Sequence, residues 1–226
     1  MNPALRASAA HVFVDALQLL TLSADDAHHL FRVLRLRDGE SVTVSDGRGS
    51  WRPSIVAGAT LEANGPVVTE STDAPLTIAV AIPKGDRAEW MVQKLTELGV
   101  SEIVFMNCAR SSVRWKGDRA GKQLARLSRV AREAAMQSRR VWLPQLRGPV
   151  DFADVAALAG AVAADPDGEP AIAATPEATT VLIGPEGGFS ESERELCRRS
   201  VTLGPHILRV ETAAICAAAI FGRSRR

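Results

Sequence analysis

Continuous apolar runs alternate with helix-like segments from about residue 76 onwards, and this alternation restricts the fold more than any other feature. Residues Leu76–Ile82 (LTIAVAI) form an uninterrupted apolar run, as in a strand that is buried on both faces of a parallel sheet. Further strands are expected at Glu102–Met106 and Thr179–Ile183. Because helices are expected between these strands, the sequence predicts an α/β domain with a mostly parallel sheet.

Helices are expected in the intervening segments of the same region. Asp86, with Glu89 three residues later, has the pattern of a capping box, and Gly99 supplies a left-handed residue after Leu98, where this helix should end. The other helices are expected at about residues 119–138, within residues 152–164, at residues 191–200 and from about residue 212 onwards.

The N-terminal part has a different pattern, in which short alternating segments are separated by turns. His11–Val14 (HVFV) and Ser41–Val44 (SVTV) have the alternation of short strands. Asp-Gly pairs within Arg37–Glu40 and Asp46–Gly49 predict hairpin turns, and Ala24–Leu36 is expected to form a short helix. We therefore expect a small β-barrel with a helical insert.

Charge is distributed unevenly along the 226 residues, although the formal net charge is only +1. Residues 1–72, the expected barrel domain, carry a net charge of −2, whereas residues 73–150 carry +7 and residues 151–226 carry −4. A near-neutral protein with one basic band is typical of a protein that contacts phosphate with a single surface. The second domain is expected to span residues 73–226.

The helix expected at residues 119–138 accounts for the basic band. At about 100° per residue, apolar side chains such as Leu127 fall on one half of the helix, and Arg126 and Arg129 fall on the other half. A solvated face usually mixes charges of both signs, yet Glu133 is the only acid of this segment. We therefore favour phosphate contact over a merely solvated face.

Composition excludes several classes of protein. Aromatic residues make up only 4% of the chain, which argues against RNA binding by stacking on several aromatic platforms. The longest apolar run, near Thr212–Phe221, is far shorter than the roughly 20 residues that span a bilayer. The N-terminus does not have the pattern of a signal peptide, and the cysteines fit neither a disulfide framework nor a zinc site. A cytoplasmic protein without a metal site is expected.

A glycine-rich turn follows the strand expected at Thr179–Ile183. Gly184, Gly187 and Gly188 allow backbone N–H groups to approach a ligand closely, and Ser190 begins a second capping box pattern. The turn matches neither a P-loop nor the dinucleotide-binding fingerprint. An uncharged nucleoside moiety therefore becomes the favoured ligand class, and an ordinary tight turn is the alternative.

A second unusual segment is Leu203–Ala213 (LGPHILRVETA). A Gly-Pro turn leads into two apolar residues, which Arg209 and Glu211 follow. The helix that comes next is almost without charge, so it must be buried inside the domain or against another chain. A buried ion pair that involves Arg209 or Glu211 is the alternative to a functional role.

Ile183–Ser190 (IGPEGGFS) and Leu203–Ala213, taken together, closely resemble the C-terminal half of the SPOUT methyltransferases. The specific resemblance is to the small-subunit ribosomal RNA uracil-N3 methyltransferases, and it covers nearly the whole chain. Several ordered motifs along one chain are far more specific than any single motif. The other matching motifs are His28–Arg37, Asp46–Gly49, Lys84–Arg87, Gln93–Gly99, Arg110-Ser111 and Arg132–Ser138.

The resemblance implies a C-terminal trefoil-knotted domain that binds S-adenosylmethionine, and an N-terminal PUA-like β-barrel. The knot would bring the loop after Ile183 and the loop from Leu203 together around the bent cofactor. Family members are usually homodimers, and the uncharged last helix is a reasonable part of the interface. The implied cofactor-binding residues are Leu182, Ile183, Gly184, Pro185, Gly187, Gly188, Leu203, Gly204, Ile207, Leu208, Arg209, Thr212 and Ala213.

The implied reaction is an in-line displacement in which uracil N3 attacks the sulfonium methyl group, so no metal is required. The proton on N3 must be removed, because a protonated N3 has no free lone pair. Arg209 and Arg110 are candidates for stabilising the developing uracil anion. Glu186 or Glu211 could accept the proton, and Glu97 is a further candidate.

The chain departs from the family pattern at two positions. Glu is expected where Met136 stands, and Gly is frequent where Arg139 stands. The first departure argues against a polar role for position 136. Neither departure lies within the segments that are expected to bind the cofactor.

Basic residues of both domains are expected to contact small-subunit ribosomal RNA, most favourably within an assembled subunit. The alternatives are a knotted methyltransferase that acts on another RNA position and a non-catalytic RNA-binding ribosome-assembly factor. The candidate RNA-binding residues are Arg32, Arg35, Arg37, Lys84, Arg87, Lys94, Arg114, Arg119, Lys122, Arg126, Arg129 and Arg132.

Overall fold

The computed structural model describes residues 2–71, 74–171 and 178–223, and the chain forms two compact units. The first unit contains residues 1–72 and 133–143, and the second contains residues 73–132 and 144–226. The sequence alone assigned residues 133–143 to the second domain, whereas the structure groups them with the first unit.

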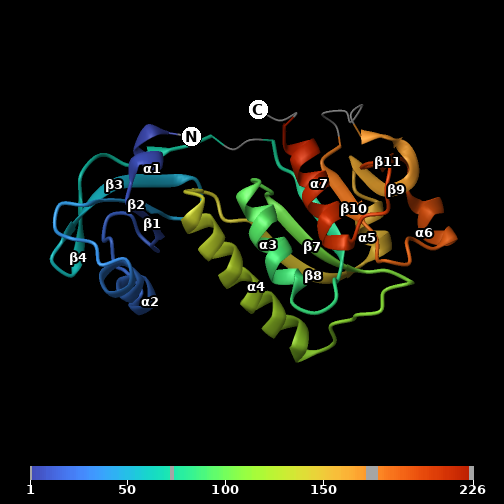
Figure 1. Ribbon diagram of the computed structural model, residues 1–226, viewed down its shortest axis with the longest axis horizontal. Helices are drawn as coiled ribbons and strands as arrows, with labels where there is room; N and C mark the ends of the chain where they lie inside the picture. Colours follow the sequence, from blue (N-terminus) through green and yellow to red (C-terminus); the bar gives the residue numbers. More distant parts are fainter. Residues whose placement is uncertain (1, 72–73, 172–177, 224–226) are drawn as a thin grey trace. The chain divides into compact units, whose positions relative to one another are not determined.

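The first unit is built on a five-stranded sheet (Figure 1). Strand β1 pairs in parallel with β2, whereas β2, β3, β4 and β5 pair in antiparallel fashion. Helices α1 and α2 and the π-helix η1 precede β2 in the chain. The bounds are α1 Pro3–Ala7, β1 Ala10–Phe13, α2 Ala24–His28, η1 His29–Val33, β2 Ser41–Ser45, β3 Ser50–Ala57, β4 Thr60–Ala63 and β5 Val68–Thr69.

One of the two expected hairpins is present. The turn at Asp46–Gly49 joins the antiparallel strands β2 and β3, as its Asp-Gly pair predicts. The turn at Arg37–Glu40 does not join a hairpin, because it leads from the η1 region into β2, whose preceding neighbour β1 runs parallel to it. The prediction of a hairpin was therefore wrong at that turn.

Residues 133–143 are attached to the first unit by backbone and side-chain contacts, among them those of Arg139 and Met136. The Arg139 guanidinium donates to the backbone oxygens of Ser8 at 3.0 Å and Ala9 at 3.1 Å. Met136 packs against the apolar core of the first unit. Arg139 also has φ 59, in the left-handed region that favours glycine. Both departures from the family pattern therefore have a structural role in this chain.

The second unit is a six-stranded sheet in which every pairing is parallel, as the sequence predicts. The strand order is β11-β9-β10-β6-β7-β8. Three of these strands were not expected from the sequence. The bounds are β6 Thr77–Ala81, β7 Glu102–Asn107, β8 Gln145–Asp151, β9 Ala161–Pro170, β10 Thr180–Ile183 and β11 Ser200–Thr202.

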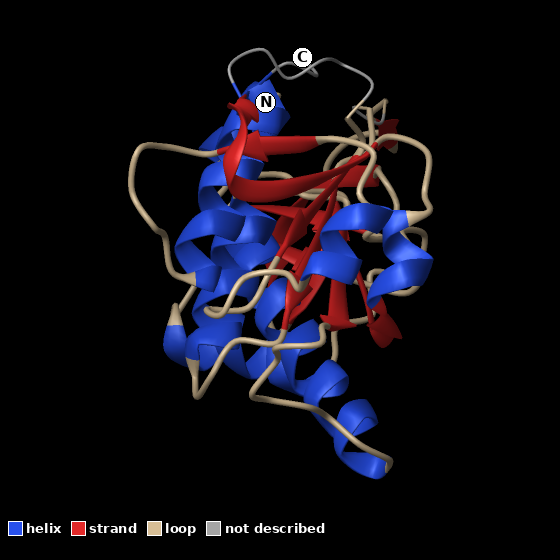
Figure 2. Ribbon diagram, turned by 90° about the vertical axis from the view of Figure 1, so that its right-hand side faces the viewer, coloured by secondary structure: helices blue, strands red, loops and turns tan. Residues whose placement is uncertain are grey.

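Helices cover both faces of this sheet (Figure 2). In β6, Ile78 and Val80 pack among residues of α3, α4 and α7, whereas Ala79 and Ala81 pack among residues of α5. This alternation is the period of two that a strand buried on both faces requires. The bounds are α3 Arg87–Glu97, α4 Asp118–Gln137, α5 Phe152–Ala156, α6 Glu191–Leu196 and α7 Val210–Arg223.

One helix lies within its expected range but fills only the first part of it, and another is shorter than the sequence suggested. The helix expected within residues 152–164 ends at Ala156, and Ala161 already begins β9. The helix expected at residues 191–200 ends at Leu196, and Ser200 begins β11. The alanine-rich start of β9 has no bulky β-branched run, so periodicity did not distinguish it from a helix.

The helix ends test the capping predictions. Ser190 and Glu193 form the expected capping box, and Gly99 has the expected positive φ of 86. Asp86 precedes α3 but makes no side-chain capping bond, so that prediction was wrong. Its intended partner Glu89 instead forms an ion pair with Arg126 of α4.

None of the helices within the described ranges combines the length and apolar character that a bilayer crossing needs.

Candidate active site

Loops at one edge of the six-stranded sheet enclose a cavity of about 310 Å³. Strands β6 and β10 are parallel neighbours, so the loops that follow them lie at the same carboxyl edge. The loop after Ile183 lines one side of the cavity, and the segment from Thr202 to Leu208 lines another. In open α/β sheets, ligands commonly bind outside the carboxyl ends of the strands.

Most of the residues expected to bind the cofactor line this cavity. Leu182 does not line it, and its side chain is buried in an apolar cluster with residues of α5. Arg209 and Thr212 also lie outside the lining. The expected residues that do line the cavity are Ile183, Gly184, Pro185, Gly187, Gly188, Leu203, Gly204, Ile207, Leu208 and Ala213.

Glycine is required at two places in the loop after β10. A Cβ atom on Gly184 would lie 3.1 Å from the ring of Phe189, which is itself buried. Gly188 has φ 67 and donates its backbone N–H to the carbonyl of Pro185 at 2.8 Å. The loop therefore folds tightly over the cavity without side chains that would fill it.

The opposite wall offers free backbone groups. Across the described ranges, the backbone groups of His206, Ile207 and Leu208 have no hydrogen-bond partner. Ile207 is 88% exposed, which is high for a large apolar side chain. Unpaired backbone donors and acceptors beside apolar side chains suit a heteroaromatic ring such as adenine.

An acidic residue of the cavity was missed from the sequence. Asp165 is 9% exposed, and its Oδ1 accepts the backbone N–H of Asp167 at 3.0 Å. Its Oδ2 lies 3.8 Å from the guanidinium of Arg194. Asp165 lies on β9, which the sequence analysis assigned in part to a helix. The sequence signal that could have indicated this residue is the Asp-Pro-Asp that follows an apolar run.

The expected catalytic residues do not all come together. Arg110 lines the cavity and donates to the carbonyl of Gly187 at 3.0 Å, and Glu186 lines the same cavity. Arg209 is exposed just before α7 and lines neither described cavity. Glu97 forms an ion pair with Lys94 at 2.8 Å on the side of α3.

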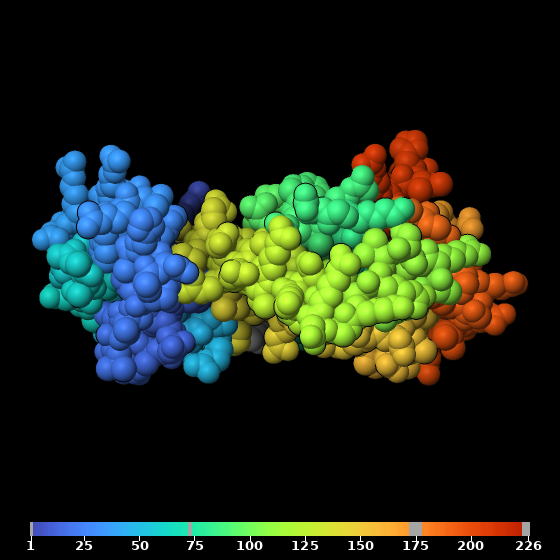
Figure 3. Space-filling model, turned by 90° about the horizontal axis from the view of Figure 1, so that it is seen from below, coloured from blue at the N-terminus to red at the C-terminus, as the bar shows by residue number. Residues whose placement is uncertain are grey.

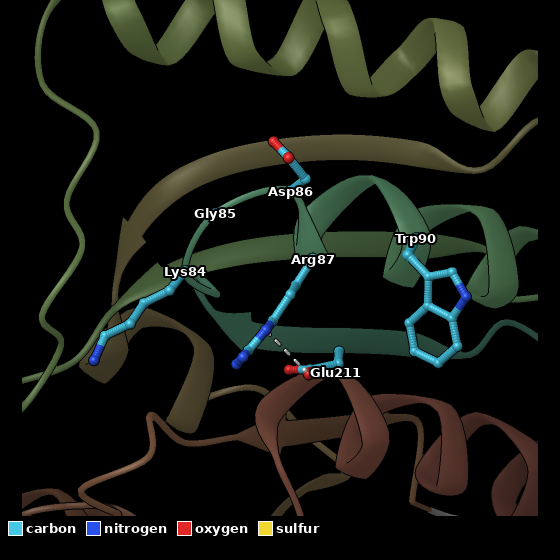
Figure 4. A pocket seen from close by; sticks show the side chains of 6 residues that line it. All are labelled: Lys84, Gly85, Asp86, Arg87, Trp90 and Glu211. Carbon is cyan, nitrogen blue, oxygen red and sulfur yellow. Dashed lines mark ion pairs between the residues drawn. The ribbon is translucent and has the colours of Figure 1, made fainter.

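Glu211 lies in a second, more open cavity of about 460 Å³ (Figure 4). Its side chain is 9% exposed, and its Oε1 lies 3.6 Å from Nε of Arg87. The ion pair that the sequence offered as the alternative for Glu211 is therefore present. The remaining lining residues are Lys84, Gly85, Asp86 and Trp90.

The basic side chains of the second unit differ in their partners. Arg119, Lys122 and Arg129 are exposed on α4, which lies uncovered on the face shown in Figure 3. Arg126, on the same helix, is paired with Glu89. Arg114 donates to the carbonyl of Cys108 at 3.3 Å. In the first unit, Arg32, Arg35 and Arg37 are exposed.

Two cysteines near the cavity are poor nucleophiles. Burial and the nearby Glu193 carboxylate raise the pKa of the Cys108 thiol to about 12. Burial, followed by Glu193 and Asp165, also raises the pKa of Cys197. Both thiols therefore stay protonated near neutral pH. In the described ranges, no group of His, Cys, Asp and Glu side chains is arranged to hold a metal ion.

Comparison with known proteins identifies the family. A family model for an RNA methyltransferase domain matches residues 70–222, and a model for an RNA methyltransferase PUA domain matches residues 22–62. The ribosomal RNA small subunit methyltransferase E of Synechocystis is 32% identical over 88% of this chain and 71% of its own length. The chain belongs to this methyltransferase family. The Bacillus subtilis relative of the same name is 29% identical over 87% of each chain.

Solved structures of methyltransferases share the fold over almost the whole chain. The structure of a probable rRNA-methyltransferase from Porphyromonas gingivalis has a TM-score of 0.78 at 28% identity, covering 96% of this chain and 98% of its own. The ribosomal RNA small subunit methyltransferase E of Neisseria gonorrhoeae was solved with S-adenosyl methionine. Its structure has a TM-score of 0.74 at 27% identity, covering 93% of this chain and 95% of its own. The expected α/β methyltransferase domain with an N-terminal PUA domain is confirmed.

Proposed function

We propose that this protein transfers a methyl group from S-adenosylmethionine to N3 of a uridine in small-subunit ribosomal RNA. The observation that carries the proposal is the 310 Å³ cavity, which two glycine-centred segments form at the carboxyl edge of a methyltransferase sheet. The Synechocystis and Bacillus subtilis relatives bear the name of an enzyme of the ribosomal RNA small subunit. We expect the enzyme to act in the cytoplasm, where ribosomal subunits are assembled.

The residues of the cavity fit S-adenosylmethionine. Ile183, Leu203 and Leu208 supply apolar surface, and the unpaired backbone groups beside them can hydrogen-bond to adenine. Asp165 and Glu186 also line the cavity, and their carboxylates would attract the ammonium and sulfonium groups of the cofactor. When bound, the cofactor supplies a methyl group that its sulfonium makes electrophilic. We also expect these loops to form the trefoil knot that the family resemblance implies.

The protein must orient the base and neutralise the charge that develops on it. Arg110 is already held beside the cavity by its hydrogen bond to Gly187. An arginine so positioned stabilises an anion without a large reorganisation during the reaction. Arg209, exposed just before α7, is the second candidate for this role. Glu186 and Glu211 are the candidates for accepting the N3 proton.

RNA affinity is proposed to come from both units. The exposed cations of α4 and the basic residues of the PUA domain would neutralise phosphates. The PUA domain matched by residues 22–62 supports an RNA substrate. We favour an assembled small subunit over naked RNA as the substrate.

A homodimer is also proposed. Several apolar side chains of α7 are only half buried in the single chain, among them Ala213, Ile215 and Ile220. A second copy of the chain packed on this helix would cover them. Sedimentation of the purified protein tests this point, because a monomer at micromolar concentration would contradict it.

Nucleoside analysis tests the function. A strain that lacks this gene should lose N3-methyluridine from its small-subunit ribosomal RNA, and a plasmid copy should restore it. Mass spectrometry of digested RNA measures the nucleoside directly. Persistence of N3-methyluridine together with loss of another methylated nucleoside would favour the alternative RNA target. An unchanged set of nucleosides together with absent cofactor binding would favour the non-catalytic assembly factor.

A further inference from the structure

The second cavity lies next to the proposed cofactor cavity. Val210 and Ala213 of α7 line the cofactor cavity, whereas Glu211 of the same helical turn lines the second cavity. These residues belong to one turn of α7, although side chains one or two positions apart point to different sides of a helix. The loop that carries Lys84 follows β6, the parallel neighbour of β10, so both cavities open at the same edge of the sheet. A molecule in the second cavity would therefore lie close to the cofactor.

Trp90 gives the second cavity an aromatic wall. The indole is 49% exposed, although it is held on the helix α3. In Figure 4 the ring lies on the side of α3 that faces α7, in line with Arg87. Trp51 and Trp115 are buried, by contrast. A rigidly mounted and exposed indole is a suitable stacking surface for a nucleobase.

Glu211 gives the cavity an unsatisfied acceptor. Its Oε1 is paired with Arg87, but its Oε2 is buried and has no hydrogen-bond partner. A buried polar atom without a partner is costly, so it marks a place where a ligand can supply the missing donor. In Figure 4 the Arg87 and Glu211 side chains meet within the cavity, between α3 and α7.

Uracil matches this arrangement. Its N3–H is a donor between two carbonyl acceptors, so it complements a carboxylate acceptor beside a guanidinium donor. The carboxylates of Glu211 and Asp86 offset the charges of Lys84 and Arg87, so the cavity has no excess positive charge that would favour a phosphate. The cavity therefore suits the base of the acceptor nucleotide better than its backbone.

We propose that this cavity holds the acceptor uracil, with Trp90 stacked on the ring, Arg87 beside a carbonyl oxygen, and Glu211 as the acceptor of the N3 proton. This inference rests on the proposed function. The N3 proton passes to the Glu211 carboxylate, and the freed lone pair of N3 forms a bond to the methyl carbon. The carbon–sulfur bond breaks, and its electron pair stays on sulfur as a neutral thioether. Glu211 then releases the proton to solvent.

The test compares Trp90 with another exposed side chain of the same region. Leu98, which ends α3, is 40% exposed and does not line the cavity, so Leu98→Ala is the matched control. Binding of the wild type, Trp90→Ala, Trp90→Phe and Leu98→Ala to unmethylated small-subunit ribosomal RNA is measured by filter binding without cofactor. Calorimetry measures S-adenosylmethionine affinity in parallel.

Trp90→Ala should weaken RNA binding by between about 5-fold and 150-fold, the range for loss of one stacked base. Trp90→Phe should recover most of that loss, and Leu98→Ala should match the wild type. Cofactor affinity should not change in any of the three. Equal RNA affinity in Trp90→Ala and Leu98→Ala would overturn the assignment, as would a loss of cofactor affinity without a loss of RNA affinity.

Glu211→Gln tests the proton acceptor separately. It should lower kcat at least 100-fold while RNA and cofactor affinities stay within about 3-fold. An unchanged kcat and pH profile would remove Glu211 from the reaction.

The two proposals fail in different ways. A wild-type protein that binds no ribosomal RNA would contradict both of them. A wild type that methylates uridine N3, with Trp90→Ala and Glu211→Gln both fully active, would contradict only the uracil cavity.

Discussion

The two cavities at the carboxyl edge of the sheet are built from different parts of the chain. The cofactor cavity is formed largely by loops, with glycines and unpaired backbone groups in its walls. The second cavity is formed by side chains at the starts of α3 and α7, and it contains an ion pair and an exposed tryptophan. A backbone-lined cavity suits a ligand that never varies, whereas a side-chain-lined cavity can be adapted to the base that is modified.

The largest expected effect comes from Arg110, which touches the loop of the first cavity. Arg110→Ala should lower kcat about 10²- to 10³-fold, because it removes a preorganised cation from the site of developing negative charge. Thermal unfolding should be nearly unchanged, since the side chain is exposed. Steady-state kinetics measure the effect. A normal kcat would assign Arg110 to loop structure alone.

A smaller effect is expected from Asp165, which only the first cavity contains. Asp165→Asn should weaken S-adenosylmethionine binding about 10-fold, because it removes a negative charge beside a cationic cofactor. RNA affinity should stay the same, which distinguishes this variant from Trp90→Ala. Calorimetry with cofactor alone provides the measurement. A matched loss of RNA affinity would show that the two cavities are not independent.

Lowering the pH is expected to reduce the folding stability of the first unit. Burial and the Arg139 guanidinium lower the pKa of His11 to about 4, and Nδ1 of the ring lies 2.9 Å from Oγ1 of Thr43. As the pH falls, His11 is protonated at a higher pH in the unfolded chain than in the folded chain. The contribution of neutral His11 to folding stability is therefore complete above about pH 6.5 and is lost as the pH drops towards 4.

The expected loss between about pH 7.5 and pH 5.5 is roughly 1 kcal/mol. Chemical denaturation at the two pH values measures this loss. His11→Gln should make the pH dependence shallower, whatever its effect on total stability. If the slope is the same in that variant, another group causes the acid sensitivity.

The smallest effect is expected on α4, outside both cavities. Arg129→Ala should reduce the slope of log K against log salt for RNA binding by about 1. Arg126→Ala should reduce the slope less, because Arg126 is already paired with Glu89. Equal reductions would show that RNA displaces Glu89 from Arg126. No reduction in either variant would assign this face of α4 to solvent.

Sequence reasoning located the first cavity better than the second, for a physical reason. The loop after Ile183 and the segment from Leu203 are continuous motifs, so their residues were found together. Trp90 and Glu211 are distant in sequence, and only the packing of α3 against α7 brings them into one cavity. Asp165 was not predicted because the alanines before it made the start of β9 difficult to distinguish from a helix.

The boundary between the units shows a similar limit. Met136 and Arg139 lie at the end of a helix pattern that continues from residue 118, so the sequence offered no break there. Arg139 is attached to the first unit through the backbone carbonyls of Ser8 and Ala9, which carry no sequence signature, and Met136 is attached by packing against its core. Contacts of this kind are visible only in the folded chain.

The most direct test of the central claim is transfer of a labelled methyl group in vitro. Purified protein is incubated with methyl-deuterated S-adenosylmethionine and with small ribosomal subunits from a strain that lacks the gene. Mass spectrometry of the digested RNA should show deuterated methyluridine that co-elutes with authentic N3-methyluridine. Label in any other nucleoside, or none in RNA despite cofactor binding, would contradict the account.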